Sequence, residues 1–332
     1  MTLEVALGER GRHDGALTVP WSRDESAYGQ LVVPVTVLQG GPGPTLLITA
    51  GVHGDEYEGQ IVLPELARTL DPGSLRGRVI LVPRANPLAA RAGRRTSPAD
   101  GGNLARLFPG DPAGGITSAL AAAIARDLLP LADAVLDLHA GGRSLEYLPC
   151  AWGRLPADPA LAGRVLDLML VFGAGIAAVT VQPGQGGTLV AEALAAGRPA
   201  FAAELGGGGA VTPATLALAR QGCRGVAAHL GILEDASAPV STRLLAVEPM
   251  HFLRSPAAGL FEPLFGLGQA VAVGEPAGLL HDPERQAAPL PLVFSASGIV
   301  ICRRVPAPCE AGDVLVHLAR DVGREELLSI QR

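Results

Sequence analysis

The segment Gly51–Gly59 carries a histidine and a carboxylate at the spacing of metal ligands. His53 and Glu56 follow Thr45–Ala50, an apolar run that predicts a buried strand. An imidazole and a carboxylate on a turn that enters a helix can converge on one cation, and this pair of nitrogen and oxygen donors suits Zn2+. The same spacing also occurs where a carboxylate only caps a helix, so a metal site needs a third ligand.

A second histidine follows another apolar run. His139 ends Ala134–His139, which also predicts a buried strand, and the small residues after it leave room around its ring. Catalytic zinc takes three protein ligands and keeps one position for water, so His53, Glu56 and His139 predict one Zn2+ per chain. Asp137 lies two residues earlier on the same face, where it either orients the ligand or is a hydrogen-bonded core aspartate.

A further carboxylate lies near the end of a third apolar run. Glu204 belongs to Ala200–Leu205, which opens onto the four glycines 206–209. Because ligands of open α/β sheets bind at the carboxyl ends of the strands, we expect Glu204 at the same edge as both histidines. A glutamate beside zinc-bound water can take its proton and later return it to a leaving amine. The structural alternative is a glutamate that caps the glycine loop.

Several arginines lie in the Gly- and Pro-rich segment 94–110. Its length is unusual for a connection inside a compact α/β domain, and long connections tend to be functional. Arginines in such segments are usually solvated. A guanidinium can also clamp a carboxylate through two hydrogen bonds or stabilise a developing oxyanion. The segment is therefore a candidate for binding the substrate.

Strands and helices alternate over residues 41–238, the part of the chain that must position these side chains. The segment Thr117–Leu129 has helical spacing, with Thr117 or Ser118 as its cap, and Thr212 precedes a proline at the first turn of another helix. This alternation predicts an α/β fold with a mostly parallel sheet covered on both faces. The predicted catalytic domain is 41–238.

The two ends of the chain have a different pattern. Residues 1–40 show the alternation of short strands and are expected to pack on the catalytic domain, whereas 239–332 is rich in strands, Gly and Pro. A weak repeat relates Gly259–Leu280 to Gly298–Leu318, each a strand, a turn and a second strand led by glycine. Two such units predict a small sandwich or barrel, which resembles half of a biotinyl- or lipoyl-carrier fold. We expect a structural or lid-forming appendage.

The composition excludes several classes of protein. All 26 basic residues are arginine, so Schiff-base, pyridoxal-phosphate and Walker A chemistry, which need lysine, are excluded, as is a carrier role. The net charge of -6 and the absence of a basic run argue against a nucleic-acid partner. The longest apolar stretch, Val165–Val181, is interrupted and short of a membrane span. Four scattered cysteines and an N-terminus without an apolar signal core favour a cytoplasmic protein with free thiols.

Three longer runs, in this order, resemble the succinylglutamate desuccinylase/aspartoacylase family, which is related to the zinc carboxypeptidases. They are HGDEYEGQI at 53–61, RTSPADGGNLARLFPGDP at 95–112 and ELGGGGAVTP at 204–213, with weaker likeness in Ser255–Leu260 and Ser297–Ala307. The resemblance runs from about residue 40 into the C-terminal region. It implies a zinc-carboxypeptidase-like mixed sheet flanked by helices, with a small C-terminal all-β domain.

The resemblance also implies roles for individual residues. It places the zinc ligands on His53, Glu56 and His139 and the general base on Glu204. The oxyanion-stabilising arginine matches Arg95. The implied substrate-binding residues share the same loop; they are Arg106, for the substrate carboxylate, with Asn103 and Arg94. The family has Asn-Arg where this chain has Ala105 before the carboxylate-binding arginine. A side-chain hydrogen bond to a charged group contributes about 1.5–3 kcal/mol, so affinity or substrate choice is expected to differ.

The implied reaction is hydrolysis of the N-acyl amide of a small amino acid. Within the family the runs are most similar to those of members that deacetylate N-acetyl-L-2,4-diaminobutyrate in ectoine breakdown. The free amine of that substrate needs an acidic partner, for which Asp55, Asp100 and Glu146 are the candidates. The alternatives are succinylglutamate or N-acetylaspartate, whose extra carboxylate would want an arginine such as Arg143, and a non-catalytic metal-binding relative. A homo-oligomer is left open.

Overall fold

A computed structural model describes residues 1–181, 186–234, 240–285 and 287–329. Its central feature is a large mixed sheet in the order β1-β2-β3-β5-β4-β6-β10-β8-β9-β11-β19-β17-β14. The strands at its centre are parallel to one another and come from the middle of the chain: β5 (Arg78–Val82), β4 (Thr45–Ala50), β6 (Ala134–His139) and β10 (Ala200–Glu204). Buried on both faces, they are nearly continuous apolar runs, as such strands must be. The predicted α/β fold is confirmed.

Strands from both ends of the chain extend this centre. On one side lie the antiparallel strands β1 (Thr2–Glu4), β2 (Gly11–Pro20) and β3 (Gln30–Gln39), of which β3 pairs with β5. On the other side lie β8 (Cys150–Gly153), β9 (Ile176–Thr180) and β11 (Arg243–Val247). Strand β8 runs antiparallel to β10, so the start of β8 lies beside the carboxyl end of β10.

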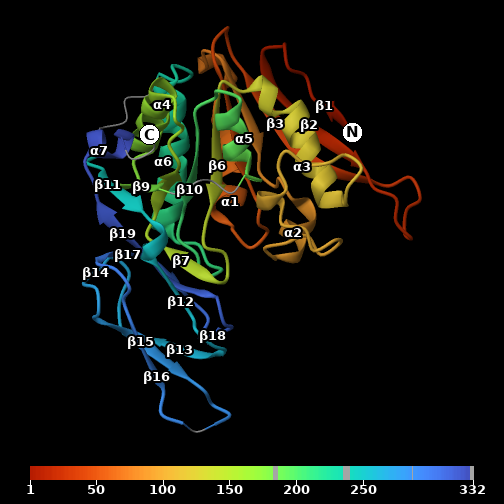
Figure 1. Ribbon diagram of the computed structural model, residues 1–332. Coiled ribbons are helices and arrows are strands. Elements are labelled where there is room, and N and C mark those ends of the chain that lie inside the picture. The colour runs from red at the N-terminus through yellow and green to blue at the C-terminus, as the bar shows by residue number, and fades with distance from the viewer. Residues whose placement is uncertain (182–185, 235–239, 286, 330–332) are drawn as a thin grey trace.

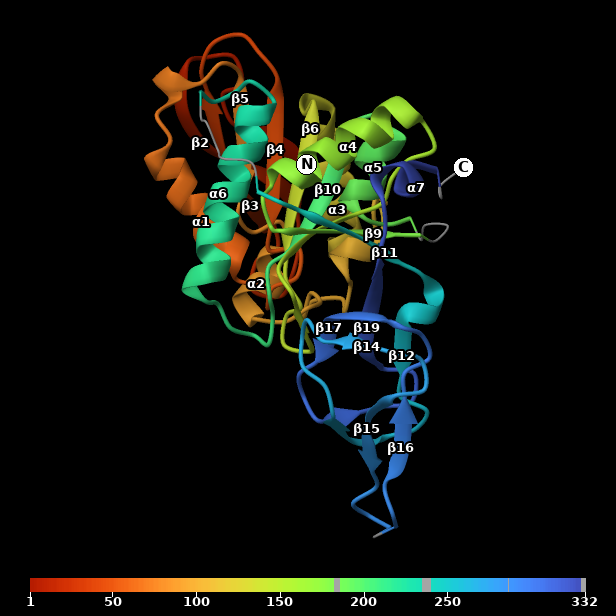
Figure 2. The same ribbon diagram turned by 90° about the vertical axis from the view of Figure 1, so that its left-hand side faces the viewer.

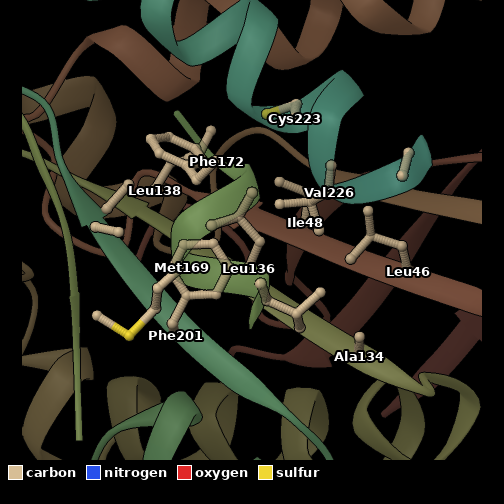
Figure 3. Close-up of a cluster of buried hydrophobic side chains, with 14 of the residues drawn as sticks. Leu46, Ile48, Ala134, Leu136, Leu138, Met169, Phe172, Phe201, Cys223 and Val226 are labelled. Carbon is tan, nitrogen blue, oxygen red and sulfur yellow. The ribbon is translucent and has the colours of Figure 1, made fainter. Parts of the chain in front are cut away.

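Helices cover both faces of the sheet (Figures 1 and 2). One face packs against α1 (Glu58–Thr69), α4 (Pro159–Val171), α6 (Pro213–His229) and α7 (Arg324–Ser329). The other packs against α3 (Ile116–Asp127) and α5 (Leu189–Ala195), while the short α2 (Pro87–Ala92) follows β5. Figure 3 shows part of the first layer, where Met169 of α4, the following Phe172 and Val226 of α6 lie over Leu136 and Phe201 of the sheet. None of the described helices has both the length and the apolar character needed to cross a membrane.

The helix starts test two predictions about caps. The predicted cap of α6 is confirmed, because Thr212 accepts a hydrogen bond from the backbone N–H of Thr215. The predicted cap of α3 is wrong: α3 begins after Gly115, and Thr117 lies inside its first turn. The side chain of Asp100, from the preceding loop, accepts hydrogen bonds from Thr117 N and Oγ1 at 2.8 and 2.6 Å. A carboxylate brought by tertiary structure thus replaces the local cap.

The C-terminal region is rich in strands and extends away from the helices (Figure 1). Its strands are β12 (Phe252–Arg254), β13 (Gly259–Pro263), β14 (Ala270–Val271), β15 (Pro276–His281), β16 (Leu290–Val293), β17 (Gly298–Arg304), β18 (Pro308–Cys309) and β19 (Val314–Asp321). Both repeat units form antiparallel pairs, β13 with β15 and β17 with β19. The pairs enclose an apolar cluster that includes Phe261, Phe294 and Leu315. The predicted boundary between 238 and 239 lies outside the described residues.

Short elements complete the fold. They are β7 (Leu145–Tyr147) and the single-turn helices η1 (Pro72–Ser74), η2 (Leu104–Arg106), η3 (Leu129–Leu131) and η4 (Pro249–His251). Strand β7 follows the end of β6 and pairs with β17, which joins the C-terminal region to the centre of the sheet. All four cysteines are free, as predicted, and all four are buried.

Candidate metal centre and active site

Two neighbouring strand ends bring His53, Glu56 and His139 together. His53 and Glu56 lie on the loop from β4 to α1, and His139 is the last residue of β6, which pairs in parallel with β4. Each of the three side chains offers one ligand atom, and these atoms lie within 4.8 Å of one another. Segments 83 residues apart in sequence thus meet at one point because parallel strands end at one edge of the sheet.

The three side chains converge through specific atoms. The two carboxylate oxygens of Glu56 lie 2.7 Å from His53 Nδ1 and 2.8 Å from His139 Nδ1. His53 and Glu56 are buried, and His139 is only 11% exposed. Two imidazole nitrogens and one carboxylate oxygen are the donor set of a catalytic zinc site, so the residues present fit this ion.

A second layer of oxygen atoms fixes both imidazole rings. His139 Nε2 lies 2.9 Å from Asp137 Oδ2, and Thr49 donates its hydroxyl proton to the other oxygen of Asp137 at 2.6 Å. His53 Nε2 lies 3.1 Å from Asn103 Oδ1. These contacts hold Nε2 of each ring, so that Nδ1 faces the point where a cation would be bound. Outer partners orient histidines that bind metals in this way.

The charges of the carboxylates in this cluster favour the binding of a cation. Burial opposes the charge of Glu56, but the adjacent His53 and His139 keep the pKa of its carboxyl well below the usual range. Burial likewise opposes a charge on His139, yet Asp137 and Glu56 raise its pKa well above the ordinary value. Both shifts show that the carboxylates remain anionic and attract positive charge to the imidazoles.

Glu204 lies next to His139 on the neighbouring strand. The register of β10 with β6 pairs the two residues, and Oε2 of Glu204 is buried without a hydrogen-bond partner. Burial, followed by repulsion from Glu56, raises the pKa of Glu204 to about 8. A carboxyl group whose pKa lies near neutral pH can accept a proton in one step and donate it in another, as general acid–base catalysis requires.

Backbone hydrogen bonds tie the loop after His139 to the glycine loop after Glu204. The carbonyl of Gly206 accepts from Gly141 N and Tyr147 N, both at 3.0 Å. A Cβ added to Gly141, or to its neighbour across the contact, Gly207, would lie only 2.1 Å from the carbonyl oxygen of Leu145. Only glycine permits this approach. The glycines that follow each functional residue in the sequence therefore hold the two loops in contact.

The loop after α2 brings one arginine to the metal ligands. Arg95 NH1 lies 3.4 Å from His53 Nδ1 and 3.6 Å from Glu56 Oε1, and its side chain is 44% exposed. The carbonyl of Arg94 accepts a hydrogen bond from Gly54 N at 2.8 Å, and this bond fixes the loop. The side chain of Arg94 is exposed and has no described contact with His53, Glu56 or His139.

Arg106 lies in the same part of the structure and is exposed. Its NH1 donates to the carbonyl of Ala105 at 2.7 Å. Burial and the charge of Arg95 lower the pKa of Arg106. Within the described part of the chain it forms no ion pair with a carboxylate. An anionic ligand here would relieve the repulsion between the two arginines.

The sequence did not indicate Glu58 as a residue of the site, nor the contact that Asn103 makes there. Glu58 is 2% exposed, accepts a hydrogen bond from Thr215 Oγ1 at 3.3 Å, and has a pKa raised to about 7 by burial. Glu58 begins a run with helical spacing, and nothing in that pattern indicated a role in the site. Asn103 was assigned to the substrate from the family likeness, and its contact with His53 could not be read from a separation of 50 residues.

Comparison with known proteins agrees with this geometry. The model of the succinylglutamate desuccinylase/aspartoacylase catalytic domain matches residues 42–230. The chain belongs to this family. It is 39% identical to the N-alpha-acetyl-L-2,4-diaminobutyric acid deacetylase of Halomonas elongata over 94% of this chain and 92% of the relative. The names of these relatives describe deacylating hydrolases, which supports the predicted class of enzyme.

Solved structures of family members have the same fold. The succinylglutamate desuccinylase/aspartoacylase of Rhodobacter sphaeroides superposes with a TM-score of 0.92 at 35% identity, covering 97% of this chain and 99% of that one. The product-bound ectoine utilization protein EutE (DoeB) of Ruegeria pomeroyi gives 0.91 at 35% identity, covering 96% and 98%. Because both alignments extend over nearly the whole chain, the C-terminal strands belong to the shared fold.

Proposed function

We propose that the protein is a zinc-dependent deacetylase that hydrolyses N-α-acetyl-L-2,4-diaminobutyrate. The observation that carries the proposal is the convergence of His53, Glu56 and His139, with Glu204 on the adjacent strand. The substrate is proposed from the 39% identity to a deacetylase of that compound. The reaction class and the donor set agree, since amide hydrolysis by such ligand sets is common.

Each side chain of the site has its own role in the proposed hydrolysis. His53, Glu56 and His139 would hold the zinc, which supplies Lewis-acid polarisation of the acyl carbonyl and lowers the pKa of a water molecule. Glu204 takes the proton of the attacking water and later gives it to the leaving amine. Arg95, 3.6 Å from Glu56, is placed to stabilise the oxyanion that develops at the same point.

The remaining proposed contacts bind the amino acid. Arg106 holds the α-carboxylate, and Arg94 adds positive charge at the exposed side. Asn103 contacts His53, so we assign it to orienting the ligand ring as well as bounding the substrate. Ala105 gives up a side-chain amide found in the family, and its carbonyl instead binds the guanidinium of Arg106.

Metal content and hydrolysis measured on the same preparation test the proposal. We expect about one zinc per chain, acetate release from N-acetyl-diaminobutyrate, and loss of both after chelation, with recovery when zinc is restored. One zinc per chain without hydrolysis of any acyl amino acid would instead indicate a metal-binding relative without catalysis.

A second substrate class is favoured by the arginines. Arg143 is exposed, and its guanidinium lies 3.3 Å from the position that a Cβ on Gly93 would take, next to the loop of Arg94 and Arg95. None of the described carboxylates pairs with it. Acidic substrates such as succinylglutamate or N-acetylaspartate would use this charge. Equal rates for N-acetylaspartate and N-acetyl-diaminobutyrate would exclude the narrower assignment.

A further inference from the structure

The proposed substrate carries an ammonium group on its side chain. Two of the three candidate carboxylates for it are engaged with other groups, whereas Oδ1 of the third, Asp55, is buried without a hydrogen-bond partner. Asp100 caps α3 through Thr117. Glu146 pairs with Arg303 at 2.7 Å. These two candidates for an acidic partner are therefore bound to other groups.

The third candidate, Asp55, is buried, and its contacts are with the backbone. Oδ2 of Asp55 accepts the backbone N–H of Arg143 at 2.9 Å, and Asp55 is 7% exposed. A Cβ on Gly142 would lie 2.5 Å from that oxygen, so the backbone closes over this side chain. Of the other described carboxylates around the ligands, Glu58 is only 2% exposed and Asp137 contacts His139, while Glu204 serves the reaction as its base.

Aromatic rings lie on the same face of the sheet as Glu204. Strand alternation and register put four partly exposed side chains on one strip, which we call the open strip: His139, Ala202, Glu204 and Trp152. Other residues on this face of the same strands, such as Asp137 and Cys150, are buried. A tryptophan that keeps solvent contact in the interior of a sheet, beside an alanine, offers a ring to a ligand.

Neighbouring rings fix the orientation of Trp152. The ring centroid of Tyr147 lies 5.8 Å from that of Trp152 at an interplanar angle of 75°, and the centroid of His317 lies 6.4 Å from it. Burial raises the pKa of Tyr147 well above its usual value, and Cys302 and then Glu204 add to the shift. Strand β7, which carries Tyr147, lies where β17 meets the sheet (Figure 1).

We propose that the face of Trp152, held by Tyr147 and His317, binds the side-chain ammonium of the substrate. The proposal rests on the proposed function, because the ammonium belongs to that substrate. Trp152 lies opposite Ala202, two residues or about 7 Å along the strand from Glu204, a distance suited to a two-methylene side chain. Tryptophan gives the strongest cation–π contact when a cation lies within about 6 Å of the ring.

The test compares N-acetyl-diaminobutyrate with N-acetyl-norvaline, in which a methyl group replaces the ammonium. Binding of both compounds is measured by calorimetry on zinc-loaded protein carrying Glu204→Gln, so the result does not depend on turnover. We expect a preference for the cationic compound that falls about 10-fold in Trp152→Leu and less in Trp152→Phe. The preference compares two ligands on one protein, so partial loss of folded protein does not change it.

A second measurement leaves the shape of the site unchanged. Fluorinated tryptophans, incorporated in a Trp21→Phe background so that Trp152 is the only site, weaken the ring's attraction for cations step by step. The preference is expected to fall with each fluorine. A preference that survives both Trp152→Leu and fluorination overturns the proposal and leaves the proposed function intact. Loss of the preference in Glu204→Gln alone, relative to the parent protein, would assign the ammonium to Glu204. Failure of both compounds to bind overturns the assignment of Trp152 together with the proposed substrate.

Discussion

Two buried histidines of this chain lie in contrasting surroundings. His139 is flanked by Asp137 and Glu56, each less than 3 Å from one of its ring nitrogens, and its pKa is raised well above the ordinary value although burial opposes this. His317 lies among the rings of Tyr147 and Phe252, and burial lowers its pKa to about 3.

The difference concerns what would turn a core histidine into a metal ligand. Both rings belong to interior strands, β6 and β19, and both are nearly inaccessible to solvent. At His139, carboxylates on both sides keep negative charge at the point where Glu56 and His53 converge. At His317, a weak contact of 3.5 Å with the hydroxyl of Tyr147 leaves the ring neutral and part of the packing. The carboxylates, rather than burial, distinguish the two sites.

Replacing each histidine gives the largest contrast. His139→Asn removes one of three ligands, so we expect bound zinc and deacetylation both to fall to background. His317→Leu should keep one zinc per chain, because no metal ligand contacts His317. Metal analysis and acetate release on the two purified variants check this. A His139→Asn variant that retained stoichiometric zinc would show that the ligand set is assigned wrongly.

Glu204→Gln separates the base from the ligands. The amide keeps the size of the side chain but cannot take a proton, so kcat should fall about 10²- to 10⁴-fold while zinc content stays unchanged. Glu65→Gln is the control, since Glu65 pairs with Arg220 on the surface. Glu204 would not be the base if its variant kept more than a tenth of the parent rate.

Asp137→Asn tests the outer partner of His139. The substitution removes a charge 2.9 Å from Nε2 and should weaken zinc binding about 10- to 100-fold, measured by competition with a chelator. Asp133→Asn is a matched control, because Asp133 precedes the start of β6 and its carboxylate accepts the N–H of Thr45 at 2.8 Å. Equal zinc affinities of Asp137→Asn and Asp133→Asn would mean that the carboxylate beside His139 does not strengthen zinc binding. That carboxylate would then no longer distinguish His139 from His317.

Local sequence carried the ligands and the base because each follows an apolar strand. His139 and Glu204 end β6 and β10, and one edge of a parallel sheet gathers whatever its strands carry at their ends. The ligands and the base depend on neighbours in the chain, so composition and order sufficed to predict them. The small residues after His139 were expected only to leave room around its ring, and the contact between its loop and the glycine loop after Glu204 was not predicted.

Features that depend on contacts between segments far apart in the chain could not be predicted from the sequence. The short strand β8 enters the sheet antiparallel to β10, and only this register puts Trp152 opposite Ala202. The cap of α3 was predicted within the helix but comes from Asp100, 17 residues away. Asn103 reaches His53 across 50 residues. Periodicity cannot report such contacts because it describes one element at a time.

The neutral state of His317 predicts how stability depends on pH. Its pKa is about 3 in the folded protein and near 6.5 when unfolded, so the unfolded chain binds more protons between these values. The contribution of this group to stability is complete above pH 6.5 and is lost as the pH falls toward 3. The charges described around it do not help to hold a proton, because the nearby Arg254 lowers the pKa further.

The loss should reach about 1.4 kcal/mol per pH unit below pH 6, in addition to the titration of the acidic groups. Denaturant unfolding of the parent and of His317→Leu, both zinc-loaded, at pH 7.0, 6.0 and 5.0 measures it. We expect the variant to be less stable at pH 7, because a buried ring contact with Phe252 is removed, but to lose less stability on acidification. His13→Leu, near the N-terminus, is the control for removing a histidine. Parallel stability curves for the parent and His317→Leu would mean that His317 has the same pKa in the folded and unfolded protein, and the contrast with His139 would then not rest on charge.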